Sequence, residues 1–220
     1  NRALIFISTA VFLASSTWFS GTAATPVLTE LWQIPAHHLG TLTTSVQIGF
    51  ITGTFLYALL NLSDIFNARR VFFVSALLGA LFNGAFALIS TGLETAVLFR
   101  FLTGLTLAGV YPVGMKLIAS WFRVGLGWRL GVMVGALALG TASPYLISYL
   151  GGGADWRVLS ALASLLAVVG GVLVMFGIPD GPHLRARAQF DARMIFKIFS
   201  HRRFRHTAFG YFGHMWELYA

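Results

Sequence analysis

Residues 71–90 read VFFVSALLGALFNGAFALIS, twenty residues without a charged side chain. A helix that crosses a membrane needs about 20 mostly apolar residues, because the hydrocarbon core is about 30 Å thick and offers no partner for backbone polar groups. This stretch therefore predicts a membrane-spanning helix.

Similar stretches lie on both sides of it. The six full-length ones are residues 4–24, 41–62, 71–90, 95–118, 129–150 and 157–178. A seventh begins near Thr207, but residues 207–220 would cover only about 21 Å as a helix, so we expect a piece of a longer protein. The stretches are continuously apolar, without the alternation of a membrane barrel. The predicted fold is an all-α polytopic membrane protein: a bundle of six transmembrane helices followed by a truncated seventh.

The composition of the 220 residues supports this class. Hydrophobic residues make up 57% and charged residues only 10%, against about 45–50% and 25% in soluble domains. A chain with so little charge cannot cover a soluble surface, which excludes an ordinary soluble enzyme, a disordered protein and a nucleic-acid-binding domain. The absence of cysteine excludes disulfides and thiolate metal sites.

The distribution of the +8 net charge predicts an orientation. If the N-terminus is cytoplasmic, 13 of the 15 Lys and Arg residues fall on the cytoplasmic side. Of the other two, Arg157 falls outside and Arg100 within the fourth stretch. Cytoplasmic loops carry such an excess of basic residues. We therefore expect an integral protein of a plasma or bacterial inner membrane, with its N-terminus in the cytoplasm.

Residues 183–206 separate the predicted bundle, residues 1–182, from the start of the seventh helix, residues 207–220. The apolar side chains of this basic linker have helical spacing: Phe190, Met194, Ile195, Ile198 and Phe199. They favour a short amphipathic helix on the inner leaflet, where anionic lipids attract Lys and Arg. An ordinary basic loop is the alternative.

The motif LLNLSDIFNARRV, residues 59–71, joins the second and third stretches. It resembles the G-x-L-A-D-R-x-G-R-R signature of the major facilitator superfamily, with Leu60 and Ile65 as departures. Asn67 stands at the signature's turn glycine, and Asn tolerates a left-handed backbone better than most residues. In this resemblance Asp64, Arg69 and Arg70 form a gate at the cytoplasmic ends of the two halves. A short loop with topology-setting arginines is the alternative.

Two glycine-patterned segments extend the resemblance along the chain. Arg100, Gly104 and Gly109 fit the family pattern of the fourth helix, in which small residues let helices approach closely. Gly135, Gly140 and Pro144 follow the Trp-Phe pair at 121–122 and form a degenerate version of the family's antiporter motif. For these residues we expect a role in helix packing. Lys116, near the inner interface, is expected to set topology.

The resemblance implies a solute site between two six-helix halves, near the bilayer midplane. The candidate solute-binding residues are Trp18, Gln47, Arg100, Tyr111 and Trp216. For Arg100 the alternative is an interfacial position paired with Glu94. Asn83 is expected to hydrogen-bond between helices.

The start of the seventh helix adds a candidate proton site. Glu217 falls about 15 Å into the membrane at helical rise, and an intramembrane carboxylate is a functional-site hypothesis by default. Its expected partner in proton coupling is His214. Pairing of Glu217 with the second half of the protein is the alternative.

Together these features predict a secondary active transporter that moves a small solute by alternating access, driven by protons. The basic and aromatic candidates suit an anionic solute. The expected partners are this solute, the lipid bilayer and the C-terminal half of the same polypeptide, with no nucleic acid. We expect no enzyme activity, cofactor or metal. The alternative function is a transport-inactive sensor or receptor with the transporter fold.

Overall fold

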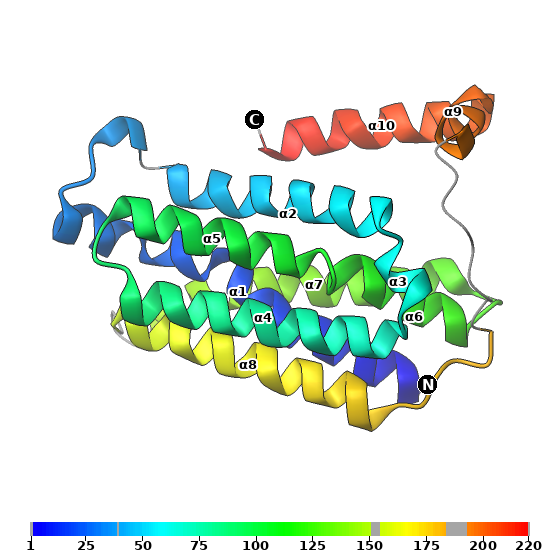
Figure 1. Cartoon of the computed structure of the whole chain (residues 1–220), viewed down its shortest axis with the longest axis horizontal. Helices are drawn as coiled ribbons and strands as arrows, with labels where there is room; N and C mark the ends of the chain where they lie inside the picture. Colours follow the sequence, from blue (N-terminus) through cyan, green and yellow to red (C-terminus); the bar gives the residue numbers. More distant parts are fainter. Residues whose placement is uncertain (1, 39, 151–154, 184–192, 220) are drawn as a thin grey trace. The chain divides into compact units, whose positions relative to one another are not determined.

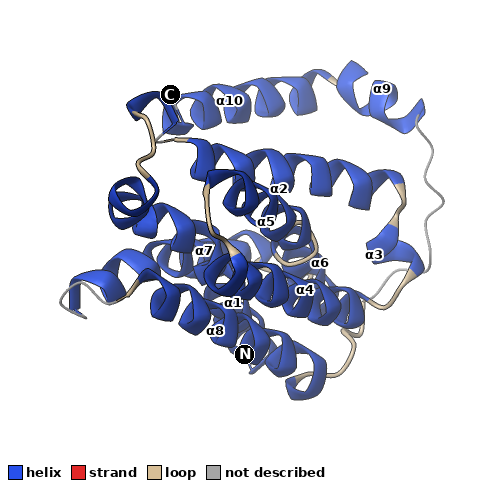
Figure 2. Cartoon of the chain, turned by 60° about the vertical axis from the view of Figure 1, so that its left-hand side comes forward, coloured by secondary structure: helices blue, strands red, loops and turns tan. Residues whose placement is uncertain are grey.

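The computed structural model describes residues 2–38, 40–150, 155–183 and 193–219, and this part of the chain contains helices and loops but no strand. Figure 2 shows the helices and loops of the described residues. Six segments are long and apolar enough to cross a membrane: Arg2–Trp32, Thr41–Leu59, Ala68–Ile89, Leu93–Trp121, Leu126–Tyr149 and Trp156–Gly177. The predicted all-α class and its six spanning segments are confirmed.

Within residues 2–177 the helices follow one another with few intervening residues. In chain order they are α1 (Arg2–Trp32), the 3-10 helix η1 (Ala36–His38), α2 (Thr41–Leu59), α3 (Leu62–Ile65), α4 (Ala68–Ile89), α5 (Leu93–Leu107), α6 (Tyr111–Trp121), α7 (Leu126–Leu150), α8 (Trp156–Gly177), α9 (Arg193–Ser200) and α10 (Arg202–Tyr219).

Two spans differ from the sequence prediction. The first helix continues to Trp32, beyond residue 24, and includes Pro26. The fourth span is divided into α5 and α6, with a turn at residues 108–110. Pro112 is the second residue of α6; a proline there has no N–H to donate, and its ring would clash with the carbonyl of residue 108 in a continuous helix.

The chain forms two compact units, residues 1–187 and 188–220. In the first, the long helices run lengthwise beside one another (Figure 1). α1 packs against α7 and α8, α4 against α5 and α8, and α2 against α5. Buried side chains such as Ile7, Val11, Phe72 and Leu117 form its main core.

The second unit contains α9 and α10. α9 lies within the segment predicted to be an amphipathic helix, but the side chains of Phe190, Met194 and Ile195 are outside the described set, so the apolar face remains a prediction. α10 begins at Arg202, five residues before the expected start at Thr207. The expected start rested on hydropathy, which shows where a chain becomes apolar and not where a helix begins. Arginine is a good helix former, so the helix includes the basic residues before Thr207.

Candidate solute-binding site

Arg100 of α5 is completely buried in the first unit. Its Nη1 donates to the carbonyl oxygen of Thr17 at 2.9 Å, and its Nη2 donates to the carbonyl oxygen of Trp18. Nη1 also lies 2.9 Å from Oδ1 of Asn83 and 3.4 Å from Oγ of Ser20. The guanidinium therefore holds α5 against the middle of α1.

Asn83 of α4 connects this arginine to a fourth helix. Its Oδ1 accepts a 2.8 Å hydrogen bond from Ser20, in addition to the bond from Arg100. Its amide donates to the carbonyl oxygen of Ser160 at 2.9 Å and to Oγ of Ser164 at 3.0 Å, both on α8. Asn83 is fully buried. It links α1, α4, α5 and α8, in agreement with the expected helix–helix role.

The charge of Arg100 is solvated by oxygen atoms and an aromatic ring. Phe86 lies with its ring centroid 5.7 Å from the guanidinium carbon. Among the described residues, the two ion pairs are Arg69–Asp180 and Lys116–Asp64, and neither includes Arg100. The alternative of an interfacial Arg100 paired with Glu94 is therefore wrong in this structure, because Arg100 is fully buried whereas Glu94 is exposed.

Gly21 makes room for this arrangement. A Cβ atom there would lie 2.7 Å from Nε of Arg100 and 2.9 Å from its Cδ. Since those atoms belong to a side chain fixed by hydrogen bonds, a larger residue at position 21 would displace the guanidinium. Residues 17–20 of the predicted polar run therefore supply oxygen acceptors to Arg100, and Gly21 leaves space for its side chain.

An aromatic cluster lies beside this polar center. The Trp18 ring packs against Phe50 of α2 with centroids 4.7 Å apart, and Phe19 packs against Tyr145 of α7 at 6.2 Å. Trp18 is 8% exposed and Tyr145 46% exposed. The cluster thus reaches from the core of the unit to its surface and joins α1, α2 and α7.

The other predicted solute residues belong to other helices than Arg100. Gln47 is a half-buried residue of α2, and Tyr111 is the half-buried first residue of α6. Trp216, His214 and Glu217 belong to α10 in the second unit, and their side chains are outside the described set. The structure brings together Arg100 and the backbone of Trp18 from the predicted group.

The predicted gate divides into two ion pairs with different partners. Asp64 binds Nζ of Lys116 at 2.6 Å, and the Ser63 carbonyl accepts from the same ammonium. Arg69 donates from Nε to Asp180 at 2.7 Å. Arg70 is exposed. The structure therefore joins the α3 turn to α6, while Arg69 contacts the segment after α8.

Arg69 also terminates α8. Its Nη1 donates to the carbonyl oxygens of Met175 at 3.2 Å and Ile178 at 2.6 Å. A cation is favourable at the carbonyl end of a helix. The hydrogen bond from Arg69 is the main reason that the pKa of the Asp180 carboxyl lies below its usual range.

Asn67 has a different role from the one its position in the motif predicts. Its φ of −60° and ψ of 125° are extended, and its Oδ1 caps α4 by accepting from the backbone N–H of Arg69 and Arg70. Its amide donates to both carboxylate oxygens of Asp180 at 2.9 Å. The left-handed residue of this connection is Asn61, with φ 51°. Asn67 therefore does not use the left-handed backbone that asparagine tolerates. Its extended conformation places the side-chain oxygen where the first backbone N–H groups of α4 need an acceptor.

Three of the predicted packing glycines lie at close helix contacts. A Cβ at Gly104 would overlap the Val46 backbone of α2, one at Gly140 the Phe12 backbone of α1, and one at Gly109 the side chain of Ser75. Gly135, in contrast, has open space at its Cβ position. Pro144 lies inside α7.

Sequence reasoning does not find the ion-pair partners Lys116 and Asp180. It favours a topology-setting role for Lys116 near the inner interface and predicts no role for Asp180. The signal for Asp180 is an acid directly after Pro179, at the strongly basic end of the predicted spans. In the described part of the chain, no group of three His, Cys, Asp or Glu residues could hold a metal ion.

These observations define the class: an integral membrane protein built as a polytopic helical bundle with buried polar contacts between its spans. A family model for the Major Facilitator Superfamily matches residues 5–219. The chain belongs to the Major Facilitator Superfamily.

Two curated relatives are transport proteins by name. The 4-hydroxybenzoate transporter PcaK of Pseudomonas aeruginosa is 30% identical over 165 residues, which are 70% of this chain and 34% of the relative. A Haemophilus influenzae protein named "Putative metabolite transport protein" is 33% identical over 128 residues, 54% of this chain and 29% of the relative. The chain thus spans about a third of the length of the curated relatives it matches.

Proposed function

We propose that the protein transports a small aromatic carboxylate by alternating access. In this proposal the six-span bundle supplies one side of the solute pathway. The observation that carries this proposal is the buried Arg100 beside the Trp18–Phe50 contact. A cation deep in a membrane protein is costly, and such residues usually mark the pathway of a substrate or an ion. The name of the Pseudomonas relative describes the transport of an aromatic carboxylate.

In this proposal Arg100 attracts the solute through its electric field. Its described hydrogen bonds go to oxygens of α1 and α4, and its side chain has no exposed surface. In a medium of low dielectric constant, a charge acts strongly over several ångströms. The solute's ring would stack on the aromatic cluster, which the exposed Tyr145 extends to the surface.

Proton coupling in this proposal uses Glu217, with His214 as its partner. Both residues belong to α10. A carboxyl group that moves between wet and dry surroundings changes its proton affinity, because burial disfavours the charged form. This change is what a proton-driven cycle requires.

The proposed second half packs against the open face of α7. Gly127, Gly131 and Gly135 repeat every four residues on α7, and each has open space at its Cβ position. Small residues at this spacing allow close contact between membrane helices. At Gly140, in contrast, the backbone of Phe12 in α1 fills the space that a Cβ atom would need. We place the basic end of the bundle in the cytoplasm and the protein in the plasma or inner membrane, from the excess of Lys and Arg at that end.

The experiment is uptake by the full-length protein in proteoliposomes under an inward proton gradient. Labelled 4-hydroxybenzoate is compared with the uncharged 4-hydroxybenzamide. Arg100→Gln should reduce carboxylate uptake at least tenfold, whereas Arg100→Lys should retain part of it, because lysine keeps the charge but not the planar hydrogen-bonding fork.

The matched control is Arg157→Gln, which removes an exposed arginine next to Trp156. It should transport at the wild-type rate. Equal uptake of amide and carboxylate, or undiminished uptake by a folded Arg100→Gln protein, would refute the role of Arg100. Solute binding without flux would contradict transport.

A further inference from the structure

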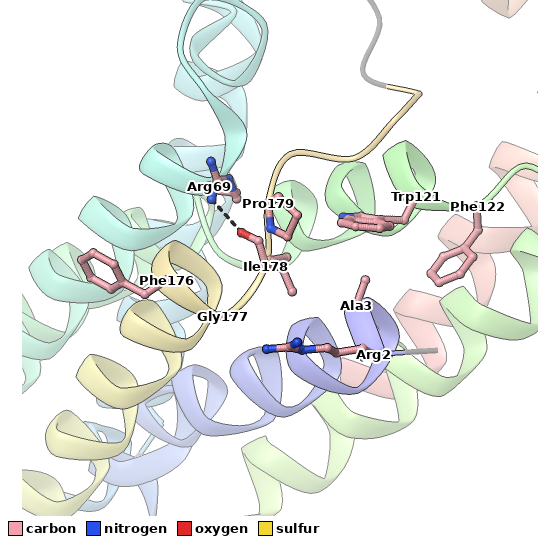
Figure 3. A pocket seen from close by; sticks show the side chains of 9 residues that line it. All are labelled: Arg2, Ala3, Arg69, Trp121, Phe122, Phe176, Gly177, Ile178 and Pro179. Carbon is pink, nitrogen blue, oxygen red and sulfur yellow. Dashed lines mark hydrogen bonds between the residues drawn. The ribbon is translucent and has the colours of Figure 1, made fainter.

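A pocket of about 680 Å³ lies at the basic end of the first unit, apart from the candidate solute site. It is formed by the first residues of α1, the ends of α6 and α8, and Arg69 of α4 (Figure 3). Arg2 and Arg69 approach it from opposite sides, with Ile178 between them. Its walls combine two cations with the aromatic side chains of Trp121, Phe122 and Phe176.

One polar group in this pocket has no partner. Nε1 of Trp121 is shielded from solvent and, in the part of the chain that the structure describes, has no hydrogen-bond acceptor. In Figure 3 this nitrogen is on the edge of the indole that faces Ile178 and Pro179. A buried donor without an acceptor costs free energy. The site therefore favours a ligand that brings an acceptor oxygen.

The cations of the pocket leave a positive charge available. The described interaction of Arg2 is with the Phe6 ring, 5.2 Å away, and Arg2 is in neither of the two ion pairs that the described residues form. Phe122, which lines the pocket, also has the guanidinium of Arg129 4.3 Å from its ring centroid. Arg69 is neutralised by Asp180. The excess charge favours an anion.

The pocket is preformed by contacts that hold the segment after α8. His183 donates from its backbone N–H to the Ser120 carbonyl at 2.9 Å, and a Cβ at Gly181 would overlap Ser120. A Cβ at Gly177 would overlap the Phe6 ring of α1. With the bonds from Arg69 to Met175 and Ile178, these contacts fix the wall that carries Ile178 and Pro179.

An apolar stripe leads from the pocket along α8. Its exposed residues recur at intervals of three or four: Val158, Leu162, Leu165, Val169, Val172 and Phe176. Phe176, at the end of the stripe, is 75% exposed and also lines the pocket. An amphiphile with its anionic group in the pocket could lay a hydrocarbon chain along this stripe, which a soluble anion could not use.

We propose that this pocket binds the phosphate headgroup of an anionic phospholipid, with Arg2 and the Trp121 N–H as phosphate contacts and an acyl chain on the α8 stripe. A basic cluster at the end of membrane helices attracts anionic lipid. The bound lipid would join α1, α6 and α8 at the end of the bundle where Arg69 and Asp180 meet.

The test compares the full-length protein in nanodiscs of phosphatidylcholine alone with nanodiscs containing 20 mol% phosphatidylglycerol. Native mass spectrometry counts the retained phosphatidylglycerol, and thermal unfolding records its stabilising effect. Arg2→Gln should weaken phosphatidylglycerol retention about fivefold, as expected for one basic residue at an anionic lipid surface. Trp121→Phe should weaken it about tenfold or more, as expected for one hydrogen bond to a charged group. Arg123→Gln, which removes an exposed arginine outside the pocket, should leave retention unchanged.

Thermal unfolding in phosphatidylcholine alone shows whether each variant is folded. If Arg2→Gln or Trp121→Phe does not fold, the other variant is enough to test the proposal. An equal effect of phosphatidylglycerol on all three variants would overturn the proposal in favour of general surface charge. An equal shift from soluble glycerol phosphate would overturn the lipid assignment in favour of a free phosphate site. The absence of any phosphatidylglycerol effect on the wild type would also overturn it.

Discussion

Oδ1 of Asn83 lies 2.9 Å from Nη1 of Arg100, and both side chains are fully buried. Among the described hydrogen bonds of Arg100, Asn83 supplies the one side-chain carbonyl oxygen. The other acceptors are the Ser20 hydroxyl and the backbone carbonyls of Thr17 and Trp18 in α1. A buried charge depends on each such acceptor because water cannot replace it.

Asn83→Leu should destabilise the protein by about 1–3 kcal/mol, because it removes acceptor and donor from a buried network and leaves Arg100 less well solvated. Thermal or denaturant unfolding in detergent measures the loss. The control is Thr141→Val, which removes a local helix hydrogen bond to Ala138 near the surface and should change stability little. Equal stability of the two variants would argue against the network.

Gly104→Ala should destabilise the contact between α2 and α5 by about 1–3 kcal/mol, because the added methyl overlaps the Val46 backbone and two helices must separate. Gly84→Ala is the control. Its Cβ would meet only Ser164 Oγ, at an ordinary 3.8 Å, and alanine favours helix over glycine by up to about 1 kcal/mol. In unfolding experiments, Gly104→Ala should lower the stability of the protein and Gly84→Ala should raise it.

Asp64 and Lys116 should show a coupling of about 0.5–1 kcal/mol in a double-mutant cycle of Asp64→Asn and Lys116→Gln. Their side chains are 36% and 27% exposed, so solvent screens the pair in part. The cycle is measured by unfolding at low and at high salt. Additive effects of the two substitutions would show that the 2.6 Å pair contributes no net interaction energy.

The Asp180 carboxylate should contribute stability that disappears in acid. Since its pKa is lowered in the folded state, mainly by the Arg69 hydrogen bond, the contribution is present above the unfolded-state pKa of about 4 and is lost as the pH falls below it. The side chain is 43% exposed, so the expected size is below about 1 kcal/mol. Unfolding of wild type and Asp180→Asn should differ at pH 7 and converge near pH 2; a constant difference would contradict the assignment.

Glu217→Gln should abolish accumulation of solute against its gradient while leaving exchange of solute across the membrane, because glutamine cannot carry a proton. Proteoliposomes with and without an imposed pH gradient distinguish the two activities. Glu94→Gln, at an exposed position at the start of α5, is the control and should keep gradient-driven accumulation. Undiminished accumulation by Glu217→Gln would exclude Glu217 as the proton carrier.

The sequence determined the membrane class, the six spans and the family resemblance, because long apolar stretches and motif spacing are local properties of a chain. It also indicated that Arg100 and Asp64 have more than a topological role. It could not supply their partners. Asp64 pairs with Lys116, 52 residues away, and Arg69 with Asp180, 111 residues away.

The same limit applies to the glycines and to Asn67. Gly104 and Gly135 both lie among apolar residues of predicted spans. A Cβ atom at Gly104 would overlap the backbone of α2, whereas one at Gly135 would meet open space. Which face of a helix a residue occupies relative to its neighbours depends on how the helices are packed. The sequence by itself determined which segments enter the membrane; only the tertiary structure decided which oxygens solvate Arg100, since these belong to helices that meet only in the folded bundle.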